Sequence, residues 1–348
     1  MTPSSSAMSL DDVTSTPSVS TRHRVLVAGL GRAGLGYACA FAMNPDAEVM
    51  GFIEPRNELR RFVRGVGFHA PSDASLLRWL TKNSGDAIVI AAPAAEAPEL
   101  VDQAVKSGLA VLVHGLAAMP GDVVERIAAS LASSSQPVAA GSAVMFHPLF
   151  ARVRRSGALR PERVTQVQAS ASVSRVFSPL AAPGRDVIDF LLADLMLLLH
   201  SSFGEVTEVK AQGQKLYGSW LDECQLEARF ANGLTAKVDA SWSLPDYPTP
   251  AMVIECSGPD GRIIVSDDAL EMDLEALQGR VVASSEPGMV RFDSGDQAVV
   301  AEGFLRMLAG DADAADALSV SRAVAVARVL DAVRQSIAAN GETREVRS

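Results

Sequence analysis

The sequence predicts an α/β protein, with a doubly wound parallel sheet first and a C-terminal α+β domain with a mainly antiparallel sheet after it. From His23 to about residue 150, short apolar runs alternate with helical patterns, as in βαβ units. Beyond residue 150, strand-like runs follow one another without helices between them, which indicates antiparallel pairing. The length of 348 residues suits two domains.

In the first half, the run Val25–Ala28 (VLVA) is typical of a strand buried on both faces. Ser72 is the expected N-cap of a helix that continues through Thr81. The pattern predicts strands at 25–28, 48–54, 86–92, 109–114 and 137–141, and helices at about 32–43, 57–65, 72–81, 96–108 and 122–132.

In the second half, a short helix is expected at 150–156 and a long strand at 163–177. A strongly apolar helix at 187–203 precedes strands at 206–216, 224–230, 235–244, 252–257, 262–266 and 281–285. Helices at 297–308 and 319–339 close the chain, and the Asp- and Ala-rich segment 310–316 is expected to be a loop. The predicted division is a leader at 1–22, a nucleotide-binding domain at 23–150 and a second domain at 151–348.

Composition excludes several classes of protein. The net charge of −10 argues against a nucleic-acid-binding surface, and no apolar run is long enough to span a membrane. The three cysteines are far apart, which favours reduced thiols in a cytoplasmic protein over a disulfide framework or a metal site. The Ser-, Thr- and Pro-rich first 22 residues lack the features of a secretory signal and predict a disordered leader.

A glycine-rich turn lies between the first strand and the first helix. In a G-x-G-x-x-G turn the first glycine permits a tight turn, the second lets the backbone approach a pyrophosphate, and the third lets the helix pack close to the sheet. The helix N-terminus then offers its N–H groups to the phosphates. A structural turn in an unrelated α/β domain, or in a methyltransferase, is the alternative. The predicted cofactor contacts at this turn are Gly29, Leu30, Gly31, Arg32, Ala33 and Gly34.

An acidic residue, Glu54, ends the second predicted strand at the usual distance from this turn and is expected to accept hydrogen bonds from the adenosine ribose. A carboxylate there favours NAD over NADP, because it repels a 2′-phosphate. Arg56 follows two residues later and would reverse the preference by pairing with that phosphate, or it is simply a solvated charge at a helix start. The choice between NAD and NADP therefore stays open.

The order of these elements resembles the Gfo/Idh/MocA (glucose–fructose oxidoreductase / inositol dehydrogenase) family over about residues 23–340. The resemblance rests on VLVAGLGRAG, on the segment 86–113, on Phe146–Pro148 and on 317–336. It implies a Rossmann domain and hydride transfer between a nicotinamide ring and a carbon that bears a hydroxyl or a ketone. It also implies that Ala92 and Pro93, after the third strand, pass under the nicotinamide side of the cofactor.

The chain departs from the family at positions that usually carry chemistry. Glu-Lys-Pro is usual after the fourth strand, but this chain has His114 and Gly115 at the first two positions. The frequent Arg-Arg pair is replaced by Val144 and Met145. The usual Asp-x-x-x-His places its aspartate at Asp189 and its histidine at Ala193, or at Asp194 if the register slips by one, and neither of these two residues is a histidine.

Three residues are candidates for the missing proton donor. His114 ends a buried strand where ligands bind in such sheets, and His147 lies in the Phe-His-Pro turn. Asp189 interrupts an apolar helix, where a carboxylate is costly unless it is paired or functional. Each also has a purely structural interpretation. Regular helical periodicity places Asp194 about 100° away from Ala193.

These observations predict an NAD(P)-dependent oxidoreductase acting on a carbonyl, secondary alcohol or imine of a small molecule less polar than a free sugar. The alternative is a catalytically divergent member that binds the cofactor as a sensor, a partner subunit or a redox-neutral enzyme. A homo-oligomer is expected through the C-terminal sheet, because the open face of that sheet needs cover. Neither nucleic acid nor a membrane is an expected partner.

Overall fold

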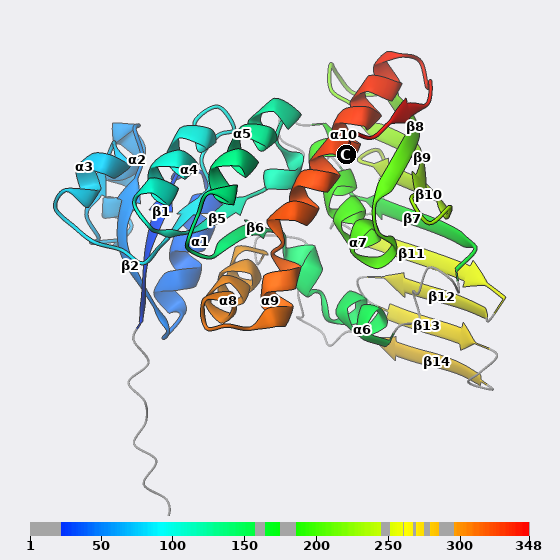
Figure 1. Ribbon diagram of the computed structural model, residues 1–348, viewed down its shortest axis with the longest axis horizontal. Coiled ribbons are helices and arrows are strands. Elements are labelled where there is room, and N and C mark those ends of the chain that lie inside the picture. The colour runs from blue at the N-terminus through cyan, green and yellow to red at the C-terminus, as the bar shows by residue number, and fades with distance from the viewer. Residues whose placement is uncertain are drawn as a thin grey trace, which may run out of the picture.

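The computed structural model describes residues 22–156, 164–174, 186–244, 251–259, 261–266, 269–274, 279–284 and 296–347. The predicted leader, apart from Arg22, therefore lies outside the described residues, as do the ends of the predicted strand 163–177 and residue 285 of the last predicted strand. Figure 1 shows two sheets with helices between and beside them.

The N-terminal sheet contains six described strands in the order β3-β2-β1-β4-β5-β6, and neighbouring strands pair in parallel. This is the doubly wound order, and the strand order reverses between β1 and β4. The predicted parallel fold is confirmed. The strands are β1 (His23–Ala28), β2 (Ala47–Ile53), β3 (Ser72–Asp73), β4 (Ala87–Ile90), β5 (Ala110–His114) and β6 (Val138–Gly141). The helices are α1 (Arg32–Met43), α2 (Asn57–Gly65), α3 (Leu76–Leu80), α4 (Ala97–Lys106) and α5 (Gly121–Ala132).

The second sheet contains nine described strands in the order β14-β13-β12-β11-β7-β10-β9-β8-β15. Only the β7–β10 pair is parallel among those described, so the sheet is mainly antiparallel, as predicted. Its strands are β7 (Gln166–Ser172), β8 (Val206–Gln214), β9 (Glu223–Phe230), β10 (Thr235–Ser241), β11 (Ala251–Gly258), β12 (Gly261–Ser266), β13 (Ala269–Leu274), β14 (Gly279–Ser284) and β15 (Arg344–Glu345). Along the chain, helix α6 (Pro148–Ser156) precedes β7, and helix α7 (Ala193–Phe203) lies between β7 and β8.

Two local predictions were wrong. Ser72 lies in the short strand β3, and the N-cap of α3 is Ser75, whose side chain accepts a hydrogen bond from the backbone N–H of Arg78. The segment expected to be a loop at 310–316 contains the helix α9 (Ala312–Ala317), because the carboxylate of Asp311 accepts from the N–H of Ala314 and caps it. Strands β13 and β15 were not predicted at all.

The C-terminal helices return to the N-terminal sheet. Helix α8 (Asp296–Leu308) packs on α1, and its residues Val300 and Phe304 share a buried apolar cluster with Val25 and Tyr37. Helix α10 (Val320–Ala338) runs between α5 and α7 (Figure 1). The predicted boundary at 150 thus separates the two sheets but does not separate all the helices that cover them.

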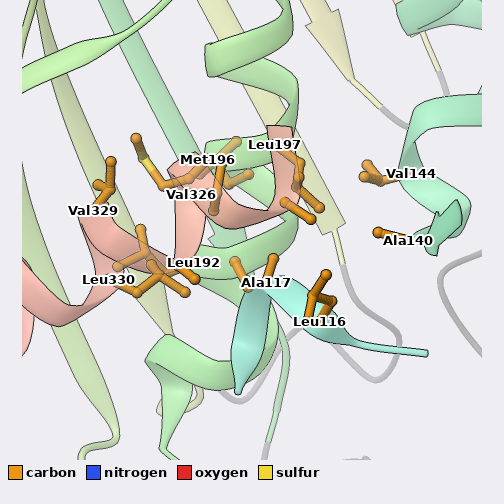
Figure 2. Close-up of a cluster of buried hydrophobic side chains, with 14 of the residues drawn as sticks. Leu116, Ala117, Ala140, Val144, Leu192, Met196, Leu197, Val326, Val329 and Leu330 are labelled. Carbon is orange, nitrogen blue, oxygen red and sulfur yellow. The ribbon is translucent and has the colours of Figure 1, made fainter. Parts of the chain in front are cut away.

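A continuous apolar cluster holds the two halves together (Figure 2). It joins the segment after β5 to α7 and α10 through side chains that are buried or nearly so, among them Leu116, Ala117, Leu192, Met196, Val326 and Leu330. Burial of such side chains is the main favourable term in folding, so the relative placement of the sheets follows from this cluster. Within the described residues, no helix combines the length and the apolar character that crossing a membrane requires.

Candidate functional site

A cavity of about 570 Å³ lies where the two halves meet. Its walls come from the N-terminus of α1, the carboxyl ends of β4, β5 and β6, and the helical segment that contains α7. In an open α/β sheet, ligands bind outside the carboxyl ends of the strands at the point where the strand order reverses. The cavity occupies that position.

The three glycines of the turn have different surroundings. A Cβ built on Gly29 would lie 2.7 Å from the backbone of Ala91 and Ala92, and φ at Gly29 is +87°. A Cβ on Gly34 would lie 1.8 Å from the carbonyl oxygen of Gly29, so the helix packs tightly against the turn. At Gly31, by contrast, no described atom lies within 4 Å of the position of a Cβ.

Gly31 is also the N-cap of α1, and no described side chain caps this helix end. Gly31, Arg32 and Ala33 line the cavity. An uncapped helix N-terminus with open space before it is a site at which a phosphate can accept backbone hydrogen bonds. The residues present therefore fit the pyrophosphate of a dinucleotide.

The carboxylate of Glu54 is fully buried, with none of its side chain exposed, and does not line the cavity. One oxygen, Oε2, accepts from the N–H of Leu30 at 2.8 Å and from Nη2 of Arg56 at 2.9 Å. The other, Oε1, accepts from the backbone N–H of Arg56 at 3.0 Å and from its Nε at 2.7 Å. Burial favours the neutral acid, but these hydrogen bonds prevail and hold the pKa of Glu54 below its usual range.

Further along the cavity, Ala92 and Pro93 follow β4, and His114 ends β5; all three line the wall. Nδ1 of His114 lies 3.3 Å from the hydroxyl of Tyr37, and the two rings meet edge to face with centroids 5.6 Å apart. Tyr37 is buried and lines the same wall, so it helps to orient the imidazole. Tyr37 carried no sequence motif and was not predicted.

The apolar helix predicted at 187–203 begins with a π-helical turn at Ile188–Leu192 and continues as α7. A π turn forms i→i+5 hydrogen bonds and accommodates one more residue than an α turn. Residues five apart therefore come closer to the same face, and both Asp189 and Asp194 line the cavity. Ala193 lines the cavity as well, so an angle of about 100° between neighbouring helical residues does not remove Asp194 from the site.

Asp194 is enclosed by protein and keeps only part of its surface open to the cavity. Its Oδ1 accepts a hydrogen bond from the hydroxyl of Ser142, at 2.8 Å. Burial raises the pKa of Asp194 to about 6, and the hydrogen bond from Ser142 opposes this rise. A carboxyl group with such a pKa can both donate and accept a proton near neutral pH.

Asp189 has a different environment. It forms an ion pair with Arg334 of α10, in which Nη2 of the arginine donates to Oδ1. Its Oδ2 also accepts from the backbone N–H of Asp186, at 3.4 Å. Asp189 therefore ties the π turn to α10, while Asp194 presents its carboxyl group to the cavity without a cationic partner among the described residues.

The remaining predicted positions lie as follows. His147 is fully buried against Phe150, with ring centroids 5.1 Å apart, and is not part of the cavity wall. Met145 is buried and lines the cavity, while Val144 is buried behind it. Gly115 lines the cavity in the left-handed conformation (φ +65°), which any side chain at this position would adopt only with strain.

Several solved structures are similar to this chain. An oxidoreductase from Agrobacterium radiobacter, in complex with NAD+, L-tartaric acid and magnesium, matches with a TM-score of 0.80 and 15% identity, over 94% of this chain and 99% of that one. GenD2 from gentamicin A biosynthesis, in complex with NAD, matches with a TM-score of 0.72 and 19% identity, over 100% of both chains. Myo-inositol 2-dehydrogenase from Lactobacillus plantarum matches with a TM-score of 0.72 and 15% identity, over 94% of this chain and 100% of that one.

No protein-family model matches the chain, and no curated protein matches it in sequence. The similarity to solved structures extends over nearly the whole chain and includes both sheets. The two-domain fold implied by the resemblance to the Gfo/Idh/MocA oxidoreductases is therefore confirmed, and this chain has the fold of those dehydrogenases.

Proposed function

We propose that the protein is an NAD(P)-dependent oxidoreductase, a divergent relative of the Gfo/Idh/MocA enzymes. One observation carries the proposal: a single cavity extends from the open N-terminus of α1, at Gly31, to the enclosed carboxyl group of Asp194. The first end suits a pyrophosphate, and the second suits proton transfer. When bound, a nicotinamide dinucleotide would supply or accept the hydride.

The chain's own residues would hold the cofactor by its phosphates and position its ring. Backbone N–H groups at the start of α1 would bind the pyrophosphate. Ala92 and Pro93 would form the wall beneath the nicotinamide side, because they follow β4 at the carboxyl edge of the sheet. The similar structures that are in complex with NAD support this use of the fold.

In this proposal Asp194 handles the proton. When a carbonyl or an imine is reduced, the carboxyl group of Asp194 would donate its proton to the oxygen or nitrogen that gains the electron pair. In the reverse direction, the carboxylate would take the proton from the hydroxyl or amine. His114, which lines the same cavity, would orient the substrate or share the proton, and Asp189 would hold the π turn in place through Arg334.

Apolar side chains form part of the cavity wall, including Leu116, Met119, Met145 and Leu197. A polyol is bound through hydrogen bonds from polar side chains to its hydroxyl groups. At a position where the family often has an arginine, this chain has the apolar Met145. This composition supports a substrate that is less polar than a free sugar, since uncompensated burial of its hydroxyl groups would be costly.

The test is a fluorescence titration of the purified protein with NADH and with NADPH. We expect saturable binding of at least one of them. Gly31→Asp introduces a carboxylate into open space where the pyrophosphate would lie, so it should abolish binding without lowering Tm. Gly218→Asp is the matched control, because no described atom lies within 4 Å of a Cβ there either. The absence of binding by either cofactor to the wild-type protein would contradict the proposal.

A screen of carbonyl compounds, secondary alcohols and imines separates this function from its alternative. Turnover that is lost in Asp194→Asn supports the oxidoreductase. Tight cofactor binding without turnover of any compound supports a divergent member that acts as a sensor, partner subunit or redox-neutral enzyme. We further propose that the protein works in the cytoplasm as a homo-oligomer assembled through the C-terminal sheet; light scattering that gives a monomer mass at micromolar concentration would contradict the assembly.

A further inference from the structure

The corner between β2 and α2 carries an unusual number of positive charges. Arg56, Arg60, Arg61 and Arg64 fall within nine residues, and Arg32 is the first residue of α1. Arg56 and Arg32 both line the cavity. The acidic groups that act on Arg56 are Glu54, through hydrogen bonds, and Glu96, through its charge.

The carboxylate at this corner is not available to a ribose. An NAD-binding site uses such a carboxylate to accept hydrogen bonds from the ribose hydroxyl groups. Here both oxygens of Glu54 already accept from protein donors, and no part of the side chain is exposed. Opening it to a ribose would break hydrogen bonds to a charged group, which are among the stronger hydrogen bonds in proteins.

The guanidinium group that covers Glu54 remains accessible. The side chain of Arg56 is 51% exposed and uses Nε and Nη2 for the carboxylate. Its Nη1 donates to none of the described residues. Glu54 therefore fixes the orientation of the guanidinium group, and the remaining N–H groups are positioned for a second anion. A guanidinium group binds phosphate oxygens with directed, charge-assisted hydrogen bonds.

We infer that this corner selects the phosphorylated cofactor: Arg56, held by Glu54 and assisted by Arg32, binds the 2′-phosphate of NADP(H). Glu54 serves as a positioning residue beneath Arg56 and not as an acceptor for the ribose. Its negative charge, which in isolation would repel a 2′-phosphate, is neutralised by the ion pair. Arg32 and Arg60 leave the corner with an excess of positive charge.

This inference rests on the proposed function, and calorimetric titration with NADPH and NADH tests it. The wild-type protein should bind NADPH roughly 10- to 100-fold more tightly than NADH, the range that one or two charge-assisted hydrogen bonds supply. Arg56→Ala should remove most of this difference by weakening NADPH alone. Because it also leaves the buried carboxylate of Glu54 without its guanidinium partner, the Tm of the variant is measured first, and its affinity for NADH is the internal reference. Arg64→Ala is the matched control, since it removes the same charge from an exposed position of α2 that does not line the cavity.

The results of these titrations test the 2′-phosphate site separately from the proposed oxidoreductase function. Equal binding of the two cofactors, tighter binding of NADH, or an equal loss of both in Arg56→Ala would overturn the 2′-phosphate site and leave the oxidoreductase proposal standing. Equal losses in Arg56→Ala and Arg64→Ala would also overturn it, because the effect would then be one of general charge. Binding of neither cofactor by the wild-type protein would overturn the proposed function itself. A second probe, adenosine 2′,5′-bisphosphate against ADP, should reproduce the preference without the nicotinamide half.

Discussion

The two ends of the cavity are built in different ways. At the α1 end, the backbone defines the site: Gly29 and Gly34 are packed so closely that neither tolerates a Cβ, and Gly31 faces open space. At the α7 end, side chains define it: the carboxyl group of Asp194 lies among apolar residues, with Ser142 as its described hydrogen-bond donor. Steric contacts fix the geometry of the α1 end, and desolvation raises the pKa of the carboxyl group at the α7 end.

From this difference we expect the two ends to tolerate substitution differently. A backbone site for a pyrophosphate works only in one conformation, so its glycines appear in the sequence as a fixed spacing. A proton-transferring group requires only a suitable pKa and access to the substrate, and different residue types can provide both. The loss of the usual lysine and histidine at Gly115 and Ala193 is therefore compatible with retained chemistry.

The largest expected effect is at the backbone end. Gly34→Ala places a Cβ 1.8 Å from the carbonyl oxygen of Gly29, so α1 must move away from the turn. We expect a loss of roughly 3 kcal/mol in the free energy of unfolding, measured by urea denaturation. Gly31→Ala is the control and should change stability by less than about 0.5 kcal/mol. Equal stability of both variants and the wild type would show that the turn is not packed as described.

The next effect is a pH dependence of stability, which we expect from the Asp194 carboxyl group at the α7 end of the cavity. Burial raises the pKa of Asp194 to about 6 in the folded protein, whereas the unfolded chain releases this proton near the ordinary aspartate pKa of 3.8. Because the folded state binds more protons between these values, stability falls as pH rises from about 4 to 6, by about 2 to 3 kcal/mol. Asp194→Asn removes the ionisable group, so this fall should disappear and the variant should be more stable than the wild type at pH 8.

Urea denaturation at several pH values measures this dependence. Ser142→Ala provides a second check, because it removes the hydrogen bond that lowers the pKa of Asp194. In that variant the fall in stability should extend to higher pH. If Asp194→Asn showed the same pH dependence as the wild type, the carboxyl group would not be desolvated, and its assignment to proton transfer would lose its physical basis.

A smaller effect on stability is expected from substitution of Asp189. This substitution distinguishes the role of Asp189 from that of Asp194. Asp189→Asn removes one partner of the ion pair with Arg334, and both side chains are about one-third exposed. We expect a loss of about 1 kcal/mol, measured by thermal denaturation. The decrease in stability that Asp194 causes between pH 4 and 6 should persist in this variant. Abolition of cofactor-dependent turnover by Asp189→Asn, with turnover intact in Asp194→Asn, would reverse the roles assigned here.

Much of the fold could be predicted from the sequence. The helix at 57–65 was predicted with the bounds that α2 has, because charged residues and one buried position, Val63, give a clear helical pattern. Most strands of the second half were also predicted from runs of alternating apolar and polar residues, although β13 and β15 were missed. The glycine-rich turn was recognisable because the backbone geometry requires glycine at Gly29 and Gly34.

The α7 end of the cavity was less predictable. The π turn at Ile188–Leu192 has no simple sequence pattern, and it changed which aspartate has an enclosed carboxyl group in the cavity. The pairing of Asp189 with Arg334 joins residues 145 positions apart, which no local pattern indicates. A useful signal was present, however: two carboxylates, Asp189 and Asp194, interrupt an otherwise apolar helix, and such residues need a partner or a function.

The most direct measurement is a crystal structure of the protein grown with NADPH. The account predicts a pyrophosphate within hydrogen-bond distance of the backbone N–H groups of Arg32 and Ala33. It also predicts a 2′-phosphate on Arg56 and the nicotinamide ring on the side of the cavity that contains Asp194. Electron density for the cofactor outside this cavity, or with its ring directed away from Asp194, would contradict the account.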